Sequence, residues 1–462
     1  MAVIPTRSNL DTNTVNILNA IRNTVGGEYA LAVPEAEASL RSIHEVGEAI
    51  MSYSPRQNAF ASTLVNRIIF EVVKSKEYEN PWAMFKAGYL EFGETVEEIF
   101  VNLASVRQYA PSDSPSNIFR RTIPSIYAGY HSMNIQVEYP LTISEDQLRQ
   151  AFTSINGVSD LIKGCITSLI TAMNYDEFNV MKYMLGRLAL DGKIKIVQIS
   201  EPTAANGHAI VTAIKSVSNK FEFLSDAYNY AGVKNNCKKD EQYLLEKSDL
   251  NAMVDVNVLA SAFNMDKAEF LGHVVTYDSI GELDTERLDI ILSADPNYTS
   301  LTSTEIGYLN KIHAFLCAKR FFMIYDNLQK MTEAYNGDGL YMNYFLHKWQ
   351  TMSTSPFENV VMFTDQTTTV TLTISEGSTA NILYEGGTLQ LTPNVSVAGF
   401  GSKDVKWSIA AGSGTLANWS VSATGLVTCN ETAANKTAVV TATSVADPSV
   451  TASITLTSKT SL

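Results

Sequence analysis

Residues 144–192 constrain the fold of this chain most strongly, because they carry the pattern of one very long helix. Ser144 is a hydroxyl N-cap, and Gln147 three residues later completes the signature of a capping box. After a short interruption, apolar residues recur at helical spacing as far as Leu188, with polar residues on the opposite face. Gly192 then provides the left-handed position at which helices commonly end. The part after the interruption would be about 50 Å long, enough to cross a whole subunit. The alternative is an ordinary long core helix.

Length and composition set the outer limits. A chain of 462 residues favours two or three domains, and 45% hydrophobic residues are enough for real cores. No apolar run is long enough to span a bilayer, and the first residues lack the apolar core of a signal peptide. The net charge of −14 argues against nucleic-acid binding through a basic surface. The four cysteines have no C-x-x-C pairing, which is typical of reduced thiols in a cytoplasm. They are Cys165, Cys237, Cys317 and Cys429.

The N-terminal region begins with short helical patterns. One pattern ends at Gly26-Gly27, a second is predicted for residues 35–52, and residues 60–69 are apolar at helical spacing. We expect these pieces to lie on another part of the molecule.

The period of the apolar pattern changes to two between residues 71 and 109, where Ile99 and its neighbours alternate as in a strand. We interpret this region as a two-stranded excursion. Since an isolated ribbon is marginal in water, it either folds back on its own domain or rests on a neighbouring subunit.

The middle of the chain mixes helices and strands without βαβ regularity, which predicts an α+β fold. Strand patterns occupy residues 120–139, 193–199 and 274–277, and a compact apolar helix is predicted at 254–263. A buried strand at 321–326 returns through a turn at 336–339 as a second strand over 340–349.

At Asp365 the composition changes abruptly. The segment 366–462 is rich in Thr and Ser, and it contains no Arg, Met or His. Short alternating stretches separated by glycine turns, such as Gly399-Phe400-Gly401, predict a β-sandwich with Trp407 as its buried aromatic. We expect this segment to fold by itself, and a chain ending at Asp365 to retain assembly.

The sequence contains no recognisable site for chemistry. P-loop, nucleophile-elbow and dinucleotide-binding motifs are absent, and the histidines form no metal-binding pattern. We therefore predict no catalytic, cofactor-binding or metal-binding residues. An acidic run lacks the loop spacing and the central glycine of an EF-hand, so a solvated face is the better interpretation. The run comprises Asp278, Glu282, Asp284, Glu286 and Asp289. The sequons at Asn394, Asn418, Asn430 and Asn435 are expected by chance in such a Ser/Thr-rich segment.

Several short runs carry a resemblance to a known family. The run 322–328 reads F-M-I-Y-D-N-L, followed by G-L-Y at 339–341 and W-Q-T at 349–351. Similar runs occur in the same order at 20–23, 95–99, 258–260, 262–265 and 270–272. Together they resemble the major capsid protein of the phi-29-type short-tailed phages over about the first 365 residues. Few residues match between Leu292 and Ala314, which indicates an insertion.

The C-terminal segment has a resemblance of its own. It resembles bacterial immunoglobulin-like domains of the second group. The matching runs are Y-E-G-G-T at 384–388, V-K-W-S at 405–408, A-T-G-L-V at 423–427 and V-T-A-T at 440–443.

The first resemblance implies the Hong Kong 97-type capsid fold, with the long helix as its spine. The expected parts are an N-terminal arm (1–70), an extended loop (71–110), a peripheral domain (111–192 and 319–365), an axial domain (193–318) and an immunoglobulin-like sandwich (366–462).

The function implied is that of a major structural subunit rather than an enzyme, and no cofactor is expected. Such subunits form the pentamers and hexamers of an icosahedral shell, assembled in the host cytoplasm with a scaffolding protein and a portal. The shell would enclose double-stranded DNA without specific binding. The rival interpretations are a host-surface adhesin bearing an immunoglobulin-like domain, which should have a signal peptide or anchor, and a metabolic enzyme, which should show a convergent polar site.

Overall fold

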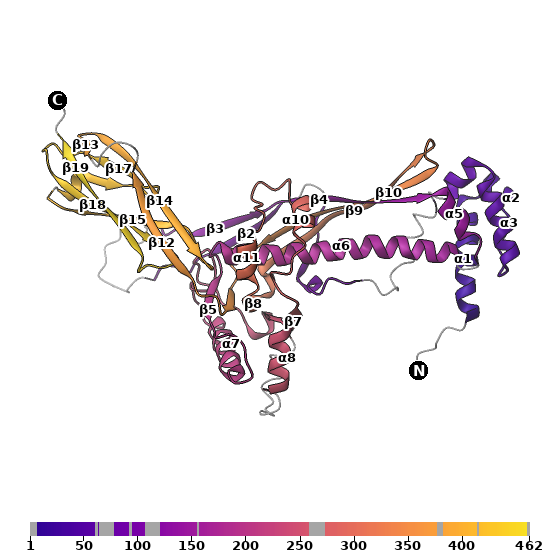
Figure 1. Ribbon diagram of the computed structural model, residues 1–462, viewed down its shortest axis with the longest axis horizontal. Coiled ribbons are helices and arrows are strands. Elements are labelled where there is room, and N and C mark those ends of the chain that lie inside the picture. Colours follow the sequence, from indigo (N-terminus) through magenta and orange to yellow (C-terminus); the bar gives the residue numbers. More distant parts are fainter. Residues whose placement is uncertain are drawn as a thin grey trace.

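The long helix predicted from the sequence is the axis of an elongated subunit (Figure 1). Helix α6 spans Gly157–Leu190, and the short helix α5 (Glu145–Ala151) precedes it. The predicted capping box is confirmed, since Ser144 accepts from the Gln147 amide and the Gln147 side chain accepts from the Ser144 amide. Gly192, with φ of 69°, ends the helix as predicted. The computed structural model describes residues 7–60, 63, 78–91, 95–106, 121–154, 157–257, 273–376, 382–413 and 415–459.

A four-stranded sheet runs along α6 in the order β1-β9-β10-β4. Its strands are β1 (Lys86–Tyr89), β9 (Phe322–Asn336), β10 (Tyr341–Thr354) and β4 (Ile135–Ser144). The predicted turn joins β9 to β10 as an antiparallel hairpin. β1 pairs in parallel with β9, placing Lys86 beside Ile324. Residues 86–89 are therefore held in the same sheet as the hairpin.

A second, five-stranded sheet lies near the C-terminal end of α6, in the order β5-β11-β8-β6-β7. Its strands are β5 (Lys195–Gln198), β11 (Val360–Thr364), β8 (Ile312–Ala318), β6 (Gln242–Lys247) and β7 (Val274–Tyr277). The nearby helices are α7 (Gly207–Phe221), α8 (Ser248–Asn257), α10 (Thr285–Ile291) and α11 (Ser303–Leu309). β11 was grouped by sequence with the hairpin, but it pairs between β5 and β8 instead. Most of the predicted helix at 254–263 lies outside the described residues.

The N-terminal helices gather at the opposite end of α6 (Figure 1). They are α1 (Arg7–Val25), α2 (Gly27–Ala32) and α3 (Leu40–Met51). As expected, they lie on another part of the chain, sharing a core of Ile21, Ile43 and Phe60 with Phe152 and Val158. The start predicted for α3 at residue 35 is wrong, because Ser39 caps the helix by accepting from the Ser42 amide. The predicted helix at 60–69 lies almost wholly outside the described residues.

Two strands form a separate ribbon. β2 (Val96–Val101) pairs antiparallel with β3 (Ile126–His131), matching Val96 with His131 and Val101 with Ile126. The strand pattern around Ile99 is confirmed. The partner strand, however, lies after residue 120 rather than within 71–109. The prediction failed here because local alternation identifies a strand but not the distant strand with which it pairs.

The C-terminal segment forms two four-stranded sheets packed around one apolar cluster. The first contains β12 (Thr369–Glu376), β14 (Gly387–Ala398), β17 (Leu426–Cys429) and β16 (Trp419–Val421). The second contains β13 (Ile382–Tyr384), β19 (Thr451–Lys459), β18 (Thr437–Ser444) and β15 (Val405–Ala411). Trp419 is the buried tryptophan of this cluster, whereas Trp407 is only half-buried beside Gly425. The choice of Trp407 from the sequence is therefore corrected.

Candidate assembly surface

The ribbon of β2 and β3 presents an apolar outer surface. Ile99 is 59% exposed, and the cross-strand partners Val101 and Ile126 are 56% and 57% exposed. Tyr130, on the same face of β3, is exposed as well. Contiguous exposed apolar side chains of this kind mark protein interaction sites, and a two-stranded ribbon needs packing partners for its stability. The outer face of the ribbon is therefore the candidate assembly surface.

The inner face of the ribbon is fastened to the body of the subunit. Glu98 accepts a hydrogen bond from Ser355 at 2.7 Å, and its other oxygen lies 3.3 Å from Nε2 of His131. Nδ1 of His131 lies 2.7 Å from Oγ of Ser353. Phe100 stacks on Phe357 with ring centroids 5.7 Å apart. These contacts set the direction in which the ribbon leaves the body.

Glu358 lies beside this inner face in an environment that opposes its ionisation. Burial raises the pKa of Glu358, the charges of Glu98 and Glu241 raise it further, and Arg320 lowers it, giving a value of about 7. Asn235 is its hydrogen-bond donor. A carboxyl group with a raised pKa keeps its proton in the folded subunit over a range where the unfolded chain releases it.

Glu358→Gln should therefore flatten the pH dependence of stability. In the wild type, stability is fully retained below about pH 4.5 and falls as the pH rises to about 7, since only the unfolded state ionises freely there. At pH 8 we expect the variant to be more stable by about 2 kcal/mol, and at pH 4.5 equally stable. Urea unfolding of unassembled subunits measures both values. Glu35→Gln, on an exposed residue, is the control. Parallel curves for wild type and Glu358→Gln would contradict this role.

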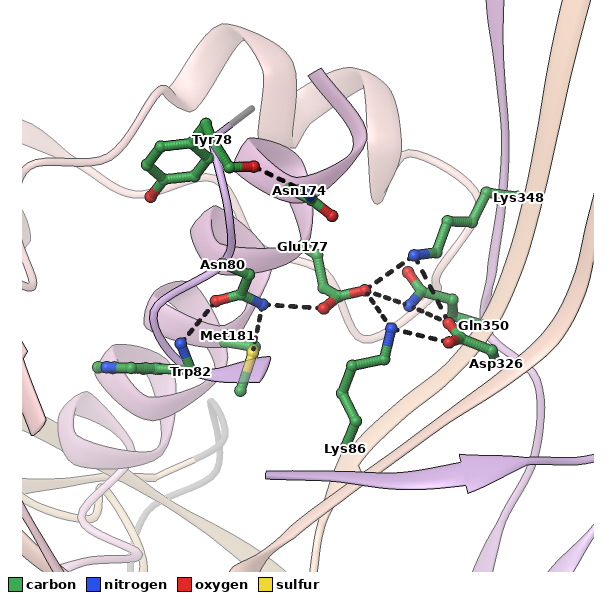
Figure 2. A network of polar contacts seen from close by, with 10 residues as sticks. All are labelled: Tyr78, Asn80, Trp82, Lys86, Asn174, Glu177, Met181, Asp326, Lys348 and Gln350. Carbon is green, nitrogen blue, oxygen red and sulfur yellow. Dashed lines mark hydrogen bonds and ion pairs between the residues drawn. The ribbon is translucent and has the colours of Figure 1, made fainter. Parts of the chain in front are cut away.

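A buried ionic cluster joins α6 to β1, to the segment before β1 and to the β9–β10 hairpin (Figure 2). Glu177 of α6 accepts from the ammonium groups of Lys348 at 2.9 Å and Lys86 at 3.1 Å. Gln350 donates to the same Glu177 oxygen at 2.7 Å, and Asn80 donates to the other at 2.8 Å. One carboxylate thus joins α6 to β10, to the first residue of β1 and to the segment before it.

Asp326 of β9 balances the charge of this cluster. It lies 2.7 Å from Nζ of Lys86 and 3.5 Å from Nζ of Lys348, so two carboxylates face two ammonium groups. Burial alone would raise the pKa of Glu177, but Lys348, Lys86 and the hydrogen bond from Asn80 outweigh it and bring the pKa to about 2. The cluster therefore pairs its opposite charges internally, which offsets the cost of burying them.

A second set of contacts holds α6 against residues 278–287. Asp176 forms a bidentate pair with Arg287, both distances being 2.6 Å. Asn179 donates to the Asp284 carbonyl, and Lys182 donates to Asp278 at 2.9 Å. The three α6 residues are spaced three apart, so they lie along one side of the helix. Glu177 and Met181 lie along another side, toward β1 and β10.

The acidic run is largely solvated, as interpreted: Asp278, Glu282, Glu286 and Asp289 are exposed, and Asp284 is half-buried. Asp278 pairs with Lys182, and Asp284 caps α10 by accepting from the Arg287 amide. Asp289 accepts from Ser300 at 2.7 Å.

Within the described residues, no group of three or more His, Cys, Asp or Glu is arranged to hold a metal ion. The same part of the chain contains no helix long and apolar enough to cross a membrane. All four cysteines are free thiols, three of them buried.

The ionic cluster was missed from the sequence, although one signal was present. On β10, alternate residues from Met342 to Leu346 are apolar and face inward, and the next two positions of this face are Lys348 and Gln350. A lysine on the inward face of a strand requires a buried partner. That partner, Glu177, lies 171 residues away in the chain.

Comparison with known proteins shows the family to which this chain belongs. The family described as Phi29-like phage major capsid protein matches residues 18–364. The chain belongs to this family. It is 32% identical over 435 residues to the major capsid protein of Bacillus phage B103, covering 92% of this chain and 88% of that protein. It is 30% identical to that of Bacillus phage PZA, covering 87% and 84%.

The fold agrees with this membership. The capsid structure of Staphylococcus phage Andhra matches with a TM-score of 0.50 and 14% identity, covering 64% of this chain and 86% of that one. The architecture is a mixed α/β fold whose structural neighbours are Hong Kong 97-type phage capsid proteins. This capsid protein is a structural subunit of an icosahedral phage shell and resides in the virion, which disfavours the adhesin alternative. Family and relatives are structural proteins rather than enzymes.

Proposed function

We propose that this capsid protein closes its shell through the ribbon of β2 and β3, which reaches over a neighbouring subunit as the extended loop. The observation that carries the proposal is the exposed apolar outer face around Ile99, Val101 and Ile126. A neighbouring subunit would bury this face and supply the packing that an isolated ribbon lacks. The extended loop then includes β3 as well as residues 71–110.

The remaining elements take the corresponding parts of a capsid subunit. We assign α6 as the spine helix, because it contacts the N-terminal helices, both body sheets and the segment 278–287. Residues 1–70 are the N-terminal arm, residues 111–192 apart from β3 and 319–365 apart from β11 the peripheral domain, and residues 193–318 together with β11 the axial domain. This grouping rests on the two separate sheets of the body.

The proposed binding partners follow from the role of a shell subunit. We propose pentamers and hexamers of this chain, formed with a scaffolding protein and a portal and enclosing double-stranded DNA without specific binding. The net charge of −14 supports the last point, because a wall without a strong basic character lets packaged DNA slide.

For residues 366–462 we propose a bacterial immunoglobulin-like domain of the second group on the outer surface of the shell. Two four-stranded sheets around one cluster are consistent with a sandwich of this type. Inside the shell the domain would occupy volume needed by DNA. Electron microscopy of assembled particles tests the placement, since the domain should project outward from every subunit.

Ile99→Asp tests the role of the ribbon. The side chain is exposed in the free subunit, so the substitution should change the stability of the subunit by less than about 0.5 kcal/mol. In an interface it would bury an unpaired charge, so closed shells should be lost. Negative-stain microscopy with co-expressed scaffold measures shell formation, and thermal unfolding measures the subunit.

The matched control is Leu416→Asp, which places the same charge on an exposed leucine of the C-terminal domain. It should leave shell formation unchanged. Closed shells of Ile99→Asp at the wild-type yield would rule out the ribbon as an assembly surface. Unfolding of its free subunit would instead place Ile99 in its own subunit's core.

A further inference from the structure

One residue of the C-terminal segment belongs to the core of the body. Phe400 lies at the tip of the turn between β14 and β15 and is only 1% exposed. It does not join the cluster between the two C-terminal sheets. It packs in the main body cluster with residues of α6 and the five-stranded sheet, and its ring lies 6.4 Å from that of Tyr308 on α11.

The backbone of the same turn touches the end of α6. A Cβ atom on Gly192 would lie 2.1 Å from the Ser402 amide nitrogen and 2.5 Å from the Gly401 carbonyl carbon. Gly192 thus meets two requirements at once: it takes the left-handed φ that ends α6, and it leaves room for the turn. No residue with a side chain could occupy position 192 without displacing the turn.

The connection between body and C-terminal sheets is short and fastened on both sides. Thr364 is fully buried and donates to the Lys311 carbonyl at 2.7 Å, and Asp365 lies 3.1 Å from Nε2 of His313. Only three residues separate Asp365 from the start of β12, and Thr368 among them donates to the Phe400 carbonyl at 2.8 Å. The linker is therefore bonded to the turn as well as to the body.

Charged residues line a cavity beside the turn that carries Phe400. Arg187 of α6 pairs with Asp191 at 2.8 Å and with Glu305 at 3.3 Å. Together with Lys403 and Asp404 from the turn, they line a cavity of about 270 Å³ between the two parts. An apolar anchor within a polar rim is the usual anatomy of a specific protein interface.

We propose that the turn Gly399–Ser402 is a plug, and that the C-terminal end of α6 with α11 is its seat. The plug holds the C-terminal domain as a rigid extension of the capsid subunit rather than as a freely tethered module. A chain ending at Asp365, which the sequence predicts to retain assembly, would carry an open apolar seat in its body core. The contacts lie within one chain, so the proposal does not depend on how subunits assemble.

The test uses full-length, unassembled subunits and compares two substitutions of equal size. Phe400→Ala empties the seat, whereas Phe85→Ala removes a buried ring from the same body cluster away from the plug. In the wild type we expect one cooperative calorimetric transition and slow proteolysis between Asp365 and Thr368. Phe400→Ala should separate the unfolding into two transitions and speed linker cleavage roughly tenfold or more. Phe85→Ala should lower the transition temperature and keep a single transition.

A glycine pair gives an independent second comparison. Gly192 and Gly232 both have positive φ, 69° and 64°, but a Cβ on Gly232 meets nothing within 4 Å. Gly192→Ala should therefore uncouple the domain as Phe400→Ala does, and Gly232→Ala should not. Two independent transitions in the wild type, or unchanged coupling in both Phe400→Ala and Gly192→Ala, would overturn the plug.

Discussion

Glu177→Gln should destabilise the unassembled subunit by about 3–5 kcal/mol at pH 7, the usual cost of removing one partner from a buried ion pair. The substitution leaves the ammonium groups of Lys86 and Lys348 facing the single carboxylate of Asp326. Glu177 and Lys348 are 3% and 2% exposed, so water cannot compensate for the lost charge. Urea unfolding followed by circular dichroism gives the free energy of unfolding directly.

The stability lost in Glu177→Gln should become smaller as the pH falls. Because the folded-state pKa of Glu177, about 2, lies below its ordinary value of 4.5, its stabilisation is complete above pH 4.5 and is lost as the pH falls toward 2. The difference between wild type and Glu177→Gln should therefore shrink over that window. A constant difference down to pH 2 would mean that the cost comes from packing rather than from charge.

Two further variants make the comparison specific to the buried cluster. Adding Lys348→Met to Glu177→Gln restores charge balance and leaves the Lys86–Asp326 pair intact, so the double variant should lose about 1–3 kcal/mol less than the sum of the single losses. Glu45→Gln removes an exposed pair with Arg41 on α3 and should cost less than about 1 kcal/mol.

Leu169→Asp should abolish folded, assembly-competent subunits. Leu169 is 6% exposed and packs with Met173 and Leu346 between α6 and the hairpin sheet. Loss of a buried leucine side chain alone costs about 2–5 kcal/mol, and the buried carboxylate adds to it. Ser168→Glu, on the adjacent exposed residue, is the matched control and should be nearly neutral. Soluble yield and thermal unfolding measure both variants, and normal shells from Leu169→Asp would contradict the assignment of this face.

The sequence predicted local features well because their causes are local. The capping box at Ser144, the helix end at Gly192 and the alternation of β2 depend on residues a few positions apart. Thr167 marks the limit of this reasoning. The helical period of the sequence places it on the polar back of α6, yet it is half-buried and engaged in a contact, whereas Ser168 is exposed. A helical period identifies a face only to within about one residue.

Features that depend on distant segments could not be predicted. Phe400 reads as part of a Gly-Phe-Gly turn, and only the folded chain brings the end of α6 to it. Likewise, the alternation in β2 does not reveal that its partner is β3. The ionic cluster joins residues from five segments, so its members are recognisable only as single charges in apolar surroundings. Long-range pairing is a property of the whole chain rather than of any window of it.

The position of β11 has a consequence for how the chain is made. It is the last strand of the body to leave the ribosome, yet its partners β5 and β8 flank it, and every one of its residues is buried. Until residue 364 has been synthesised, the nascent chain carries the facing edges of β5 and β8 without the strand that joins them. Unpaired edges of this kind invite association with other chains. Truncated chains that end before β11 should therefore aggregate rather than accumulate as partial subunits.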